Sequence, residues 1–147
     1  MIHPVVMLLI SIATFLPTAS ADMEGLKTYK DLLEETNSRI RNIDTDSLKR
    51  VLEENPNMVL LDVRLPGEVE SMGHIDAKQQ VNIPRGWVEV RIVNHVIDKD
   101  TPIVAYCGAG IRSAFVVDVL RNMGFTDVQN YAEGFLGWQQ RGLPIVR

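Results

Sequence analysis

The sequence predicts an α/β domain in which a parallel β-sheet is flanked by helices on both faces. Short apolar runs that suit strands alternate with amphipathic segments that suit helices. The run over residues 58–63 is apolar almost throughout, which is typical of a strand covered on both faces. A second run, 103–106, leads directly into a glycine-containing loop and a helical pattern. The 147 residues suffice for one such domain, and no repeat or low-complexity linker divides it.

The beginning of the chain has the pattern of a secretory signal peptide. An apolar run over residues 5–16 precedes Ala19-Ser20-Ala21, which matches an Ala-x-Ala cleavage site. The run is shorter than the about 20 residues that span a bilayer. We therefore expect residues 1–21 to be removed, leaving an exported, periplasmic protein with no stable membrane span that begins at Asp22. The region before the run has no Lys or Arg, so an uncleaved anchor stays open as the alternative.

Residues 22–38 are predicted to be an N-terminal helical extension. The helical pattern covers residues 24–39, and we expect this helix to pack against the domain. Its apolar face comprises Leu26, Tyr29, Leu32, Leu33 and Thr36.

The domain itself, residues 39–147, alternates predicted strands and helices. Asp44 is the expected N-cap of a helix that runs to Glu54, and Gly124 is expected just past the end of the helix that opens at Ser113. The expected strands are 40–43, 58–63, 81–83, 103–106 and 127–131, and the other expected helices are 66–72, 87–96 and a final turn after Gly134.

One histidine and two tryptophans are predicted to have structural roles. His95 lies beside the apolar stripe of the helix over 87–96, which indicates a histidine at the edge of the core and not a catalytic base. Trp87 and Trp138 are interpreted as packing residues.

Cys107 is the candidate nucleophile, because it follows the strand over 103–106 at its carboxyl end. Gly108 and Gly110 allow successive backbone N–H groups to point at one place, and the following helix adds partial positive charge there. Both effects favour a thiolate. A lone buried cysteine acting as a small hydrophobic residue is the alternative, but the Gly-x-Gly spacing and the strand end favour function.

Composition excludes several other classes of site. The net charge of −4 and the lack of a basic run argue against nucleic acid as a partner. One cysteine excludes an intramolecular disulfide and a Cys-rich zinc site, and His3, His74 and His95 show no metal-ligand spacing. We predict neither a metal nor a cofactor.

A set of short motifs occurs in a distinctive order. The motifs are Leu61-Asp62-Val63-Arg64, Gly73-His74-Ile75, Asn82-Ile83-Pro84, Tyr106-Cys107 with Gly110 and Arg112-Ser113, Gly124-Phe125, and Gly134-Phe135…Trp138…Gly142-Leu143-Pro144. Together they resemble a single rhodanese domain.

The resemblance implies a rhodanese-like fold and a thiosulfate sulfurtransferase. It implies that Cys107 takes sulfane sulfur from thiosulfate or a similar donor as a persulfide and passes it to cyanide or a thiol acceptor. The donor and acceptor are small molecules, and no partner protein is identified. The substrate-binding residues implied are Gly108, Ala109, Gly110, Ile111, Arg112 and Ser113, with Asp62 and Arg64 supporting the loop.

Two departures from the family pattern concern access to the site. Gly108 follows Cys107 where many rhodaneses have Arg, which removes one cationic contact to an anionic donor. The segment between Ile75 and Asn82 is also about two residues longer than the usual spacing, which lengthens a surface loop. Arg112 is expected either to fold over the loop or to pair outward with a carboxylate such as Asp62.

Two other functions stay open. A Cys-based phosphatase shares the N–H cradle, but it needs five residues between Cys and Arg, and here Ser113 occupies the position of that Arg. A non-turnover sulfur carrier or binding module for a partner protein would keep the same Cys107 and loop. Turnover with excess thiosulfate and cyanide would separate the carrier from the enzyme.

Overall fold

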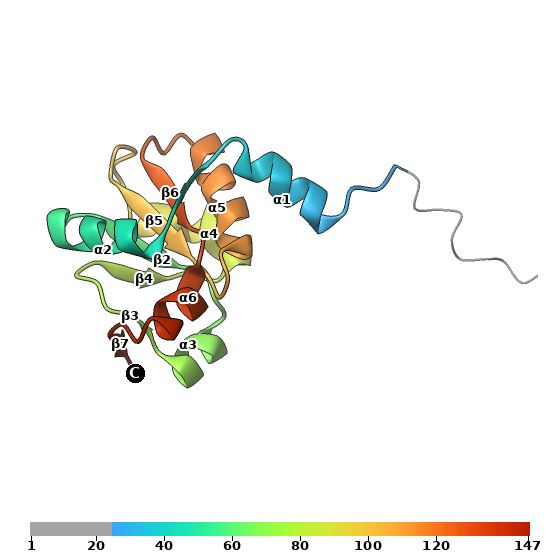
Figure 1. Cartoon of the computed structure of the whole chain (residues 1–147). Helices are drawn as coiled ribbons and strands as arrows, with labels where there is room; N and C mark the ends of the chain where they lie inside the picture. Colours follow the sequence, from blue (N-terminus) through green and yellow to red (C-terminus); the bar gives the residue numbers. More distant parts are fainter. Residues whose placement is uncertain (1–24) are drawn as a thin grey trace, which may run out of the picture.

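A five-stranded parallel sheet forms the centre of the structure, a computed structural model that describes residues 25–147 (Figure 1). Its strand order is β1-β6-β5-β2-β4, and all four neighbouring pairs are parallel. The strands are β1 (Arg41–Ile43), β2 (Val59–Asp62), β4 (Gln80–Asn82), β5 (Ile103–Tyr106) and β6 (Val128–Tyr131). The predicted signal peptide, residues 1–21, lies outside the described residues.

Helices cover both faces of the sheet. The α-helices are α1 (Tyr29–Asn37), α2 (Thr45–Glu54), α3 (Pro66–Met72), α4 (Val88–Arg91), α5 (Ile111–Asn122) and α6 (Gly134–Gln140). One apolar cluster joins the sheet to α4 and α5, and the other joins it to α2 and α6. The predicted fold class, a parallel sheet flanked by helices on both faces, is confirmed. Among residues 25–147, none of the helices has the length and apolar character needed to cross a bilayer.

The two central strands, β2 and β5, place the candidate site. All residues of both strands are buried, as their apolar sequences predict. Asp62 is in register with Tyr106, so the carboxyl ends of β2 and β5 lie side by side. Cys107 directly follows β5 and therefore emerges at this edge of the sheet, where ligands of open α/β sheets bind.

Several helix boundaries follow from the cap residues that the sequence indicates. Asp44 caps α2, because its carboxylate accepts a hydrogen bond from the Ser47 backbone N–H at 2.8 Å. Gly124 follows the end of α5 with a φ of 102°, and the Phe125 N–H donates back to the Leu120 carbonyl at 3.1 Å. Both predictions are confirmed.

The predicted helix over residues 87–96 is only partly correct. The segment is α4 between two short 3₁₀ helices, Arg85–Trp87 and Ile92–Asn94. Val88, Ile92 and Val96 are buried as expected, but His95 is exposed, so its placement at the edge of the core is wrong. The chain leaves α-helical geometry after Arg91, and the His95 side chain no longer follows the buried stripe.

The two tryptophans differ in their environment. Trp138 is buried and donates from Nε1 to the Pro144 carbonyl at 2.8 Å, which confirms a packing role. Trp87 is 50% exposed, and the Arg91 guanidinium lies over its ring at 4.5 Å. The Trp87 ring therefore packs at the surface, against Arg91, and not in the core.

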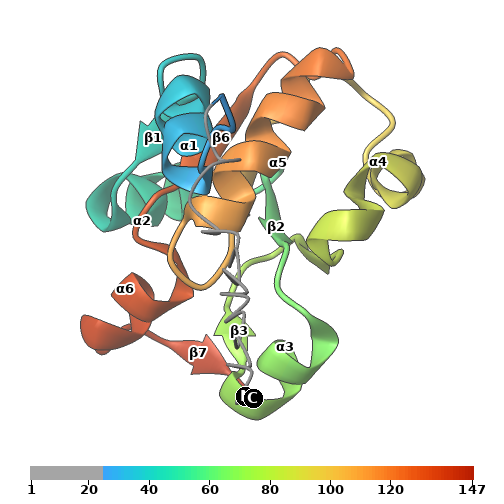
Figure 2. The same ribbon diagram turned by 90° about the vertical axis from the view of Figure 1, so that its right-hand side faces the viewer.

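Helix α1 is shorter than the predicted 24–39. Thr28 stops it at the N-terminal end, because the Thr28 hydroxyl and the Asp31 side chain form a capping box. The helix lies beside α5 (Figure 2), and Arg39, just beyond it, pairs with Asp118 of α5 at 2.9 Å. On its predicted apolar face Thr36 is buried, while Leu26, Tyr29 and Leu32 are exposed.

A second, two-stranded sheet lies beside α3. Strand β3 (His74–Ile75) pairs antiparallel with β7 (Ile145–Val146). The Ile75 N–H also donates to the Tyr106 hydroxyl at 3.3 Å. These contacts connect α3, which ends at Met72, to the main sheet.

Candidate active site

The loop after β5 turns sharply into α5. Gly110 adopts a φ of +77°, a left-handed conformation that glycine enters with little cost. Its carbonyl accepts the Ala114 N–H at 3.1 Å, which begins the helix at Ile111. The helix therefore starts two residues before the predicted Ser113, and Ile111 and Arg112 belong to its first turn.

The Cys107 thiol faces several hydrogen-bond donors of this loop and helix start. The Ser113 hydroxyl lies 3.6 Å from Cys107 Sγ. Burial by itself raises the pKa of the Cys107 thiol, but hydrogen bonds from the Ser113 hydroxyl and from the backbone N–H groups of Ser113, Ala109 and Arg112 outweigh it, so the pKa is lowered. The predicted N–H cradle is thus present around the sulfur, and it favours the thiolate.

The loop is held tightly by the segment that follows β6. The Phe135 and Leu136 N–H groups, at the start of α6, donate to the carbonyls of Cys107 and Gly108 at 2.7 and 3.0 Å. A Cβ added at Gly134 would lie 2.6 Å from the Gly108 carbonyl oxygen. Only glycine permits this approach, so the Gly134 backbone fixes the base of the loop.

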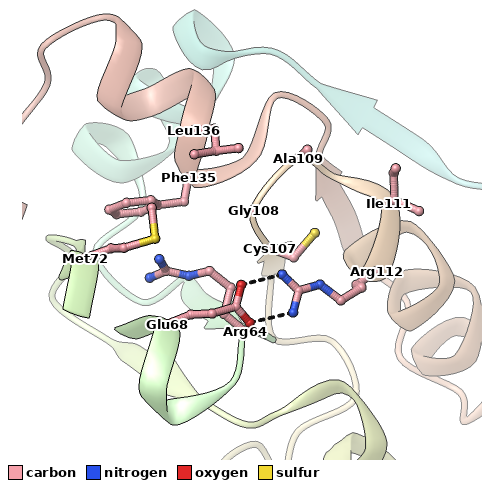
Figure 3. A pocket seen from close by; sticks show the side chains of 10 residues that line it. All are labelled: Arg64, Glu68, Met72, Cys107, Gly108, Ala109, Ile111, Arg112, Phe135 and Leu136. Atoms are coloured by element: carbon pink, nitrogen blue, oxygen red, sulfur yellow. Dashed lines mark hydrogen bonds and ion pairs between the residues drawn. The ribbon is translucent and has the colours of Figure 1, made fainter. Parts of the chain in front are cut away.

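A pocket of about 420 Å³ opens above the thiol (Figure 3). Its size is that of a site for a small molecule. Apolar and charged side chains share its walls. The lining residues are Arg64, Glu68, Met72, Cys107, Gly108, Ala109, Ile111, Arg112, Phe135 and Leu136.

Arg112 pairs outward across this pocket, but its partner is Glu68 and not the expected Asp62. Two hydrogen bonds of 2.7 Å join the guanidinium to the two carboxylate oxygens (Figure 3). The pairing lowers the pKa of Glu68 to about 2 and raises the pKa of Arg112. Much of the positive charge that Arg112 brings to the pocket is therefore balanced.

Asp62 and Arg64 form a buried ion pair. The Arg64 backbone N–H and Nε both donate to Asp62 Oδ1 at 3.0 Å, and Nη2 lies 2.6 Å from Oδ2. Nη2 also donates to the Gly73 carbonyl at 2.7 Å, and the guanidinium lies 4.0 Å from the centroid of the Phe135 ring. The pair thus ties the end of β2 to α3 and α6, and Arg64 itself borders the pocket.

Most predicted site residues border the pocket or the thiol, and some contributors were missed. Gly110 and Ser113 do not line the pocket, but Gly110 shapes the loop and the Ser113 hydroxyl contacts the sulfur. The structure adds Glu68, Met72, Phe135 and Leu136. Glu68 has a local signal, because its side chain accepts from the Leu65 N–H at the start of α3. That signal indicates a helix cap and gives no sign of a pocket. Among residues 25–147, no group of His, Cys, Asp and Glu side chains is arranged to hold a metal ion.

Comparisons with known proteins agree with this geometry. A family model described as "Rhodanese-like domain" matches residues 44–141. A sulfurtransferase from Allochromatium vinosum is 33% identical over 107 residues, which cover 73% of this chain and 95% of that protein. Thiosulfate sulfurtransferase PspE from Escherichia coli is 36% identical over 70 residues, covering 48% of this chain and 64% of that protein. The polysulfide-sulfur transferase homodimer from Wolinella succinogenes has a similar solution structure, with a TM-score of 0.73 and 28% identity over 85% of this chain and 90% of that one.

Proposed function

This chain belongs to the family of rhodanese-like domains, and from that premise we propose that it moves sulfane sulfur through a persulfide on Cys107. The donor is thiosulfate or a similar sulfane compound, and the acceptor is cyanide or a thiol. The observation that carries the proposal is the ring of donors around Cys107 Sγ, which lowers the pKa of the thiol inside a small-molecule pocket.

The chemistry needs two displacements at sulfur. The Cys107 thiolate attacks the outer sulfur of thiosulfate, the sulfur–sulfur bond of the donor breaks, and sulfite leaves with the electron pair. Cyanide then attacks the outer sulfur of the persulfide, thiocyanate leaves, and the thiolate is restored. The first step needs no general base because the attacking thiolate is already formed, and the second needs none because the attacking cyanide is itself an anion.

The same donors suit both anions of the cycle. The backbone N–H groups of Ala109, Arg112 and Ser113 are aimed at the Cys107 sulfur and so favour negative charge on it. A persulfide anion extends that charge by one atom into the pocket. The names of the Escherichia coli and Wolinella relatives make thiosulfate and polysulfide the two donors to compare first.

The position of Ser113 argues against phosphatase chemistry. A Cys-based phosphatase would need a guanidinium where Ser113 places a hydroxyl 3.6 Å from Cys107 Sγ. Arg112, one residue earlier, is bound to Glu68.

Intact mass after incubation with thiosulfate is the direct test of the persulfide. The protein should gain the mass of one sulfur atom, and cyanide should remove it. Cys107→Ser should gain nothing while keeping the melting temperature, because oxygen fits the loop but cannot form a persulfide. Transfer that persists in Cys107→Ser would refute the proposal.

Turnover with excess thiosulfate and cyanide separates an enzyme from a carrier. Continuous thiocyanate production is expected. A single-turnover burst that ends after one equivalent would instead identify a sulfur carrier.

A further inference from the structure

Three asparagine side chains form a hydrogen-bonded line from helix α1 to the active-site loop. Asn130 of β6 donates from Nδ2 to the Gly110 carbonyl at 3.2 Å and to Asn42 Oδ1 at 2.8 Å. Asn42 of β1 donates from Nδ2 to Oδ1 of Asn37, at the end of α1, at 3.1 Å. The same three residues border a cavity of about 210 Å³ that the loop also lines.

The Gly110 end of this line determines which asparagine atoms donate and which accept. A backbone carbonyl can only accept, so the Asn130 atom that faces Gly110 must be the amide nitrogen. Both hydrogens of that nitrogen are then used, one by Gly110 and one by Asn42. Asn42 must present its oxygen to Asn130 and is left to donate to Asn37. The Gly110 carbonyl therefore orients the entire line.

Asn130 is buried although its side chain is polar. It is 2% exposed, and its Oδ1 has no hydrogen-bond partner among residues 25–147. A buried polar group with an unpaired atom costs free energy that an apolar residue would avoid. Its observed hydrogen bonds are both donated, which points to the Gly110 carbonyl as the reason for an amide here.

The Gly110 carbonyl belongs to the loop that forms the thiol cradle, and it also accepts the Ala114 N–H that begins α5. Its peptide group lies in the chain between Ala109 and Arg112, two of the residues whose N–H groups stabilise the Cys107 sulfur. A shift of this peptide would move the part of the loop that joins the two residues and so change how their N–H groups face the thiol. The loop also has no space to shift toward β6, because a Cβ on Gly110 would lie 2.1 Å from the Ala132 carbonyl oxygen.

We infer that Asn130 is a positioning residue for the Cys107 loop, and that Asn42 and Asn37 extend this support to the N-terminal helix. The inference rests on the proposed role of Cys107 as the reactive thiolate. Arg39, which pairs with Asp118 of α5, holds the outer end of the line against the same helix that begins at the site. The N-terminal extension is thus part of the support of the active-site loop.

The test uses the full chain and the fact that Cys107 is its single cysteine. The rate of alkylation by iodoacetamide is measured against pH, so that the profile reports the Cys107 thiolate alone. Asn130→Ala should lower the rate at neutral pH by about threefold to tenfold, the fold-change of one lost hydrogen bond. Asn42→Ala should lower it by about twofold to threefold, because its effect passes through Asn130.

Two further variants sharpen the result. Asn42→Asp keeps an acceptor for Asn130 Nδ2 at an exposed position, so it should restore the profile that Asn42→Ala loses. Asn94→Ala is the matched control, since Asn94 is an exposed asparagine outside the line, and it should leave the profile unchanged. If Asn130→Ala does not fold, the comparison of Asn42→Ala with Asn42→Asp still tests the inference.

Two outcomes would overturn the inference. One is an Asn42→Ala profile that matches Asn94→Ala. The other is an Asn130→Ala protein with a lower melting temperature and an unchanged thiol profile, which would show a purely structural role. Failure of the proposed function is a separate result, because alkylation does not require sulfur transfer.

Discussion

Ser113→Ala is the substitution that tests the thiolate most directly. Ser113 is fully buried, and its hydroxyl lies 3.6 Å from Cys107 Sγ. A hydrogen bond donated to the sulfur favours the charged form, so removal of the hydroxyl must raise the pKa of the Cys107 thiol. The backbone N–H groups remain in Ser113→Ala, so only one of the donors is lost.

The size of the effect follows from the contact. A hydrogen bond contributes about 1 kcal/mol, and this one is long even for sulfur. We therefore expect the alkylation rate at neutral pH to fall by about fivefold, since about 1.4 kcal/mol corresponds to tenfold. At alkaline pH, above the thiol pKa of both proteins, the two rates should converge.

The assay is iodoacetamide alkylation followed by intact mass across a pH series. Ser71→Ala is the control, because the Ser71 hydroxyl bonds to the Gly67 carbonyl at 2.8 Å on an exposed helix. Rate profiles of Ser113→Ala and wild type that superimpose at every pH would refute the reasoning.

The remaining predictions concern charge, backbone and processing. Glu68→Gln should lower KM for thiosulfate by about threefold to tenfold, because it frees the Arg112 guanidinium to contact the donor. The side chains of Arg112 and Glu68 are 37% and 32% exposed, and solvent screening limits the effect. An unchanged KM would show that Arg112 only braces α3. Since the pKa of Glu68 is lowered to about 2, any stability advantage of wild type over Glu68→Gln in urea unfolding should be present above about pH 4.3 and vanish near pH 2. Gly110→Ala should lower the free energy of unfolding by more than about 3 kcal/mol, because the new side chain must adopt a left-handed φ and clashes with the Ala132 backbone. Gly142→Ala is the control, because Gly142 has a φ of +65° but open space around it. It should lower the free energy of unfolding by only about 1 kcal/mol. Protein from the envelope of the source cell should begin at Asp22 by N-terminal sequencing, and full-length chain in the cytosol would contradict the proposed export.

The sequence predicts elements well where the signal is local. The α2 N-cap at Asp44, the helix over 66–72 and the strand before Cys107 depend on neighbouring residues, and all three occur in the structure. Helix α5 starts at Ile111, two residues before the predicted Ser113, because the left-handed turn at Gly110 ends the loop sooner than the apolar pattern indicates.

The partners of the site residues depend on distant parts of the chain. Glu68 and Arg112 are brought together by the packing of α3 against the start of α5, and nothing near either residue shows this. The sequence position of Asp62 suits a contact with Arg112, but Arg64, two residues after Asp62, already satisfies its carboxylate. The asparagine line has the same origin at its inner end, since Asn42 of β1 and Asn130 of β6 meet only in the folded sheet.

The small sheet of β3 and β7 is expected to open more readily than the main sheet. Only two residue pairs join these strands, and they hold the segment that follows α3. In native-state hydrogen exchange, short elements with few hydrogen bonds open locally while the central strands exchange only on global unfolding. The amides of β3 and β7 should therefore exchange long before those of β5. Because β3 follows α3 directly, exchange of the β3 amides would also report on the mobility of the pocket wall that Glu68 and Met72 form.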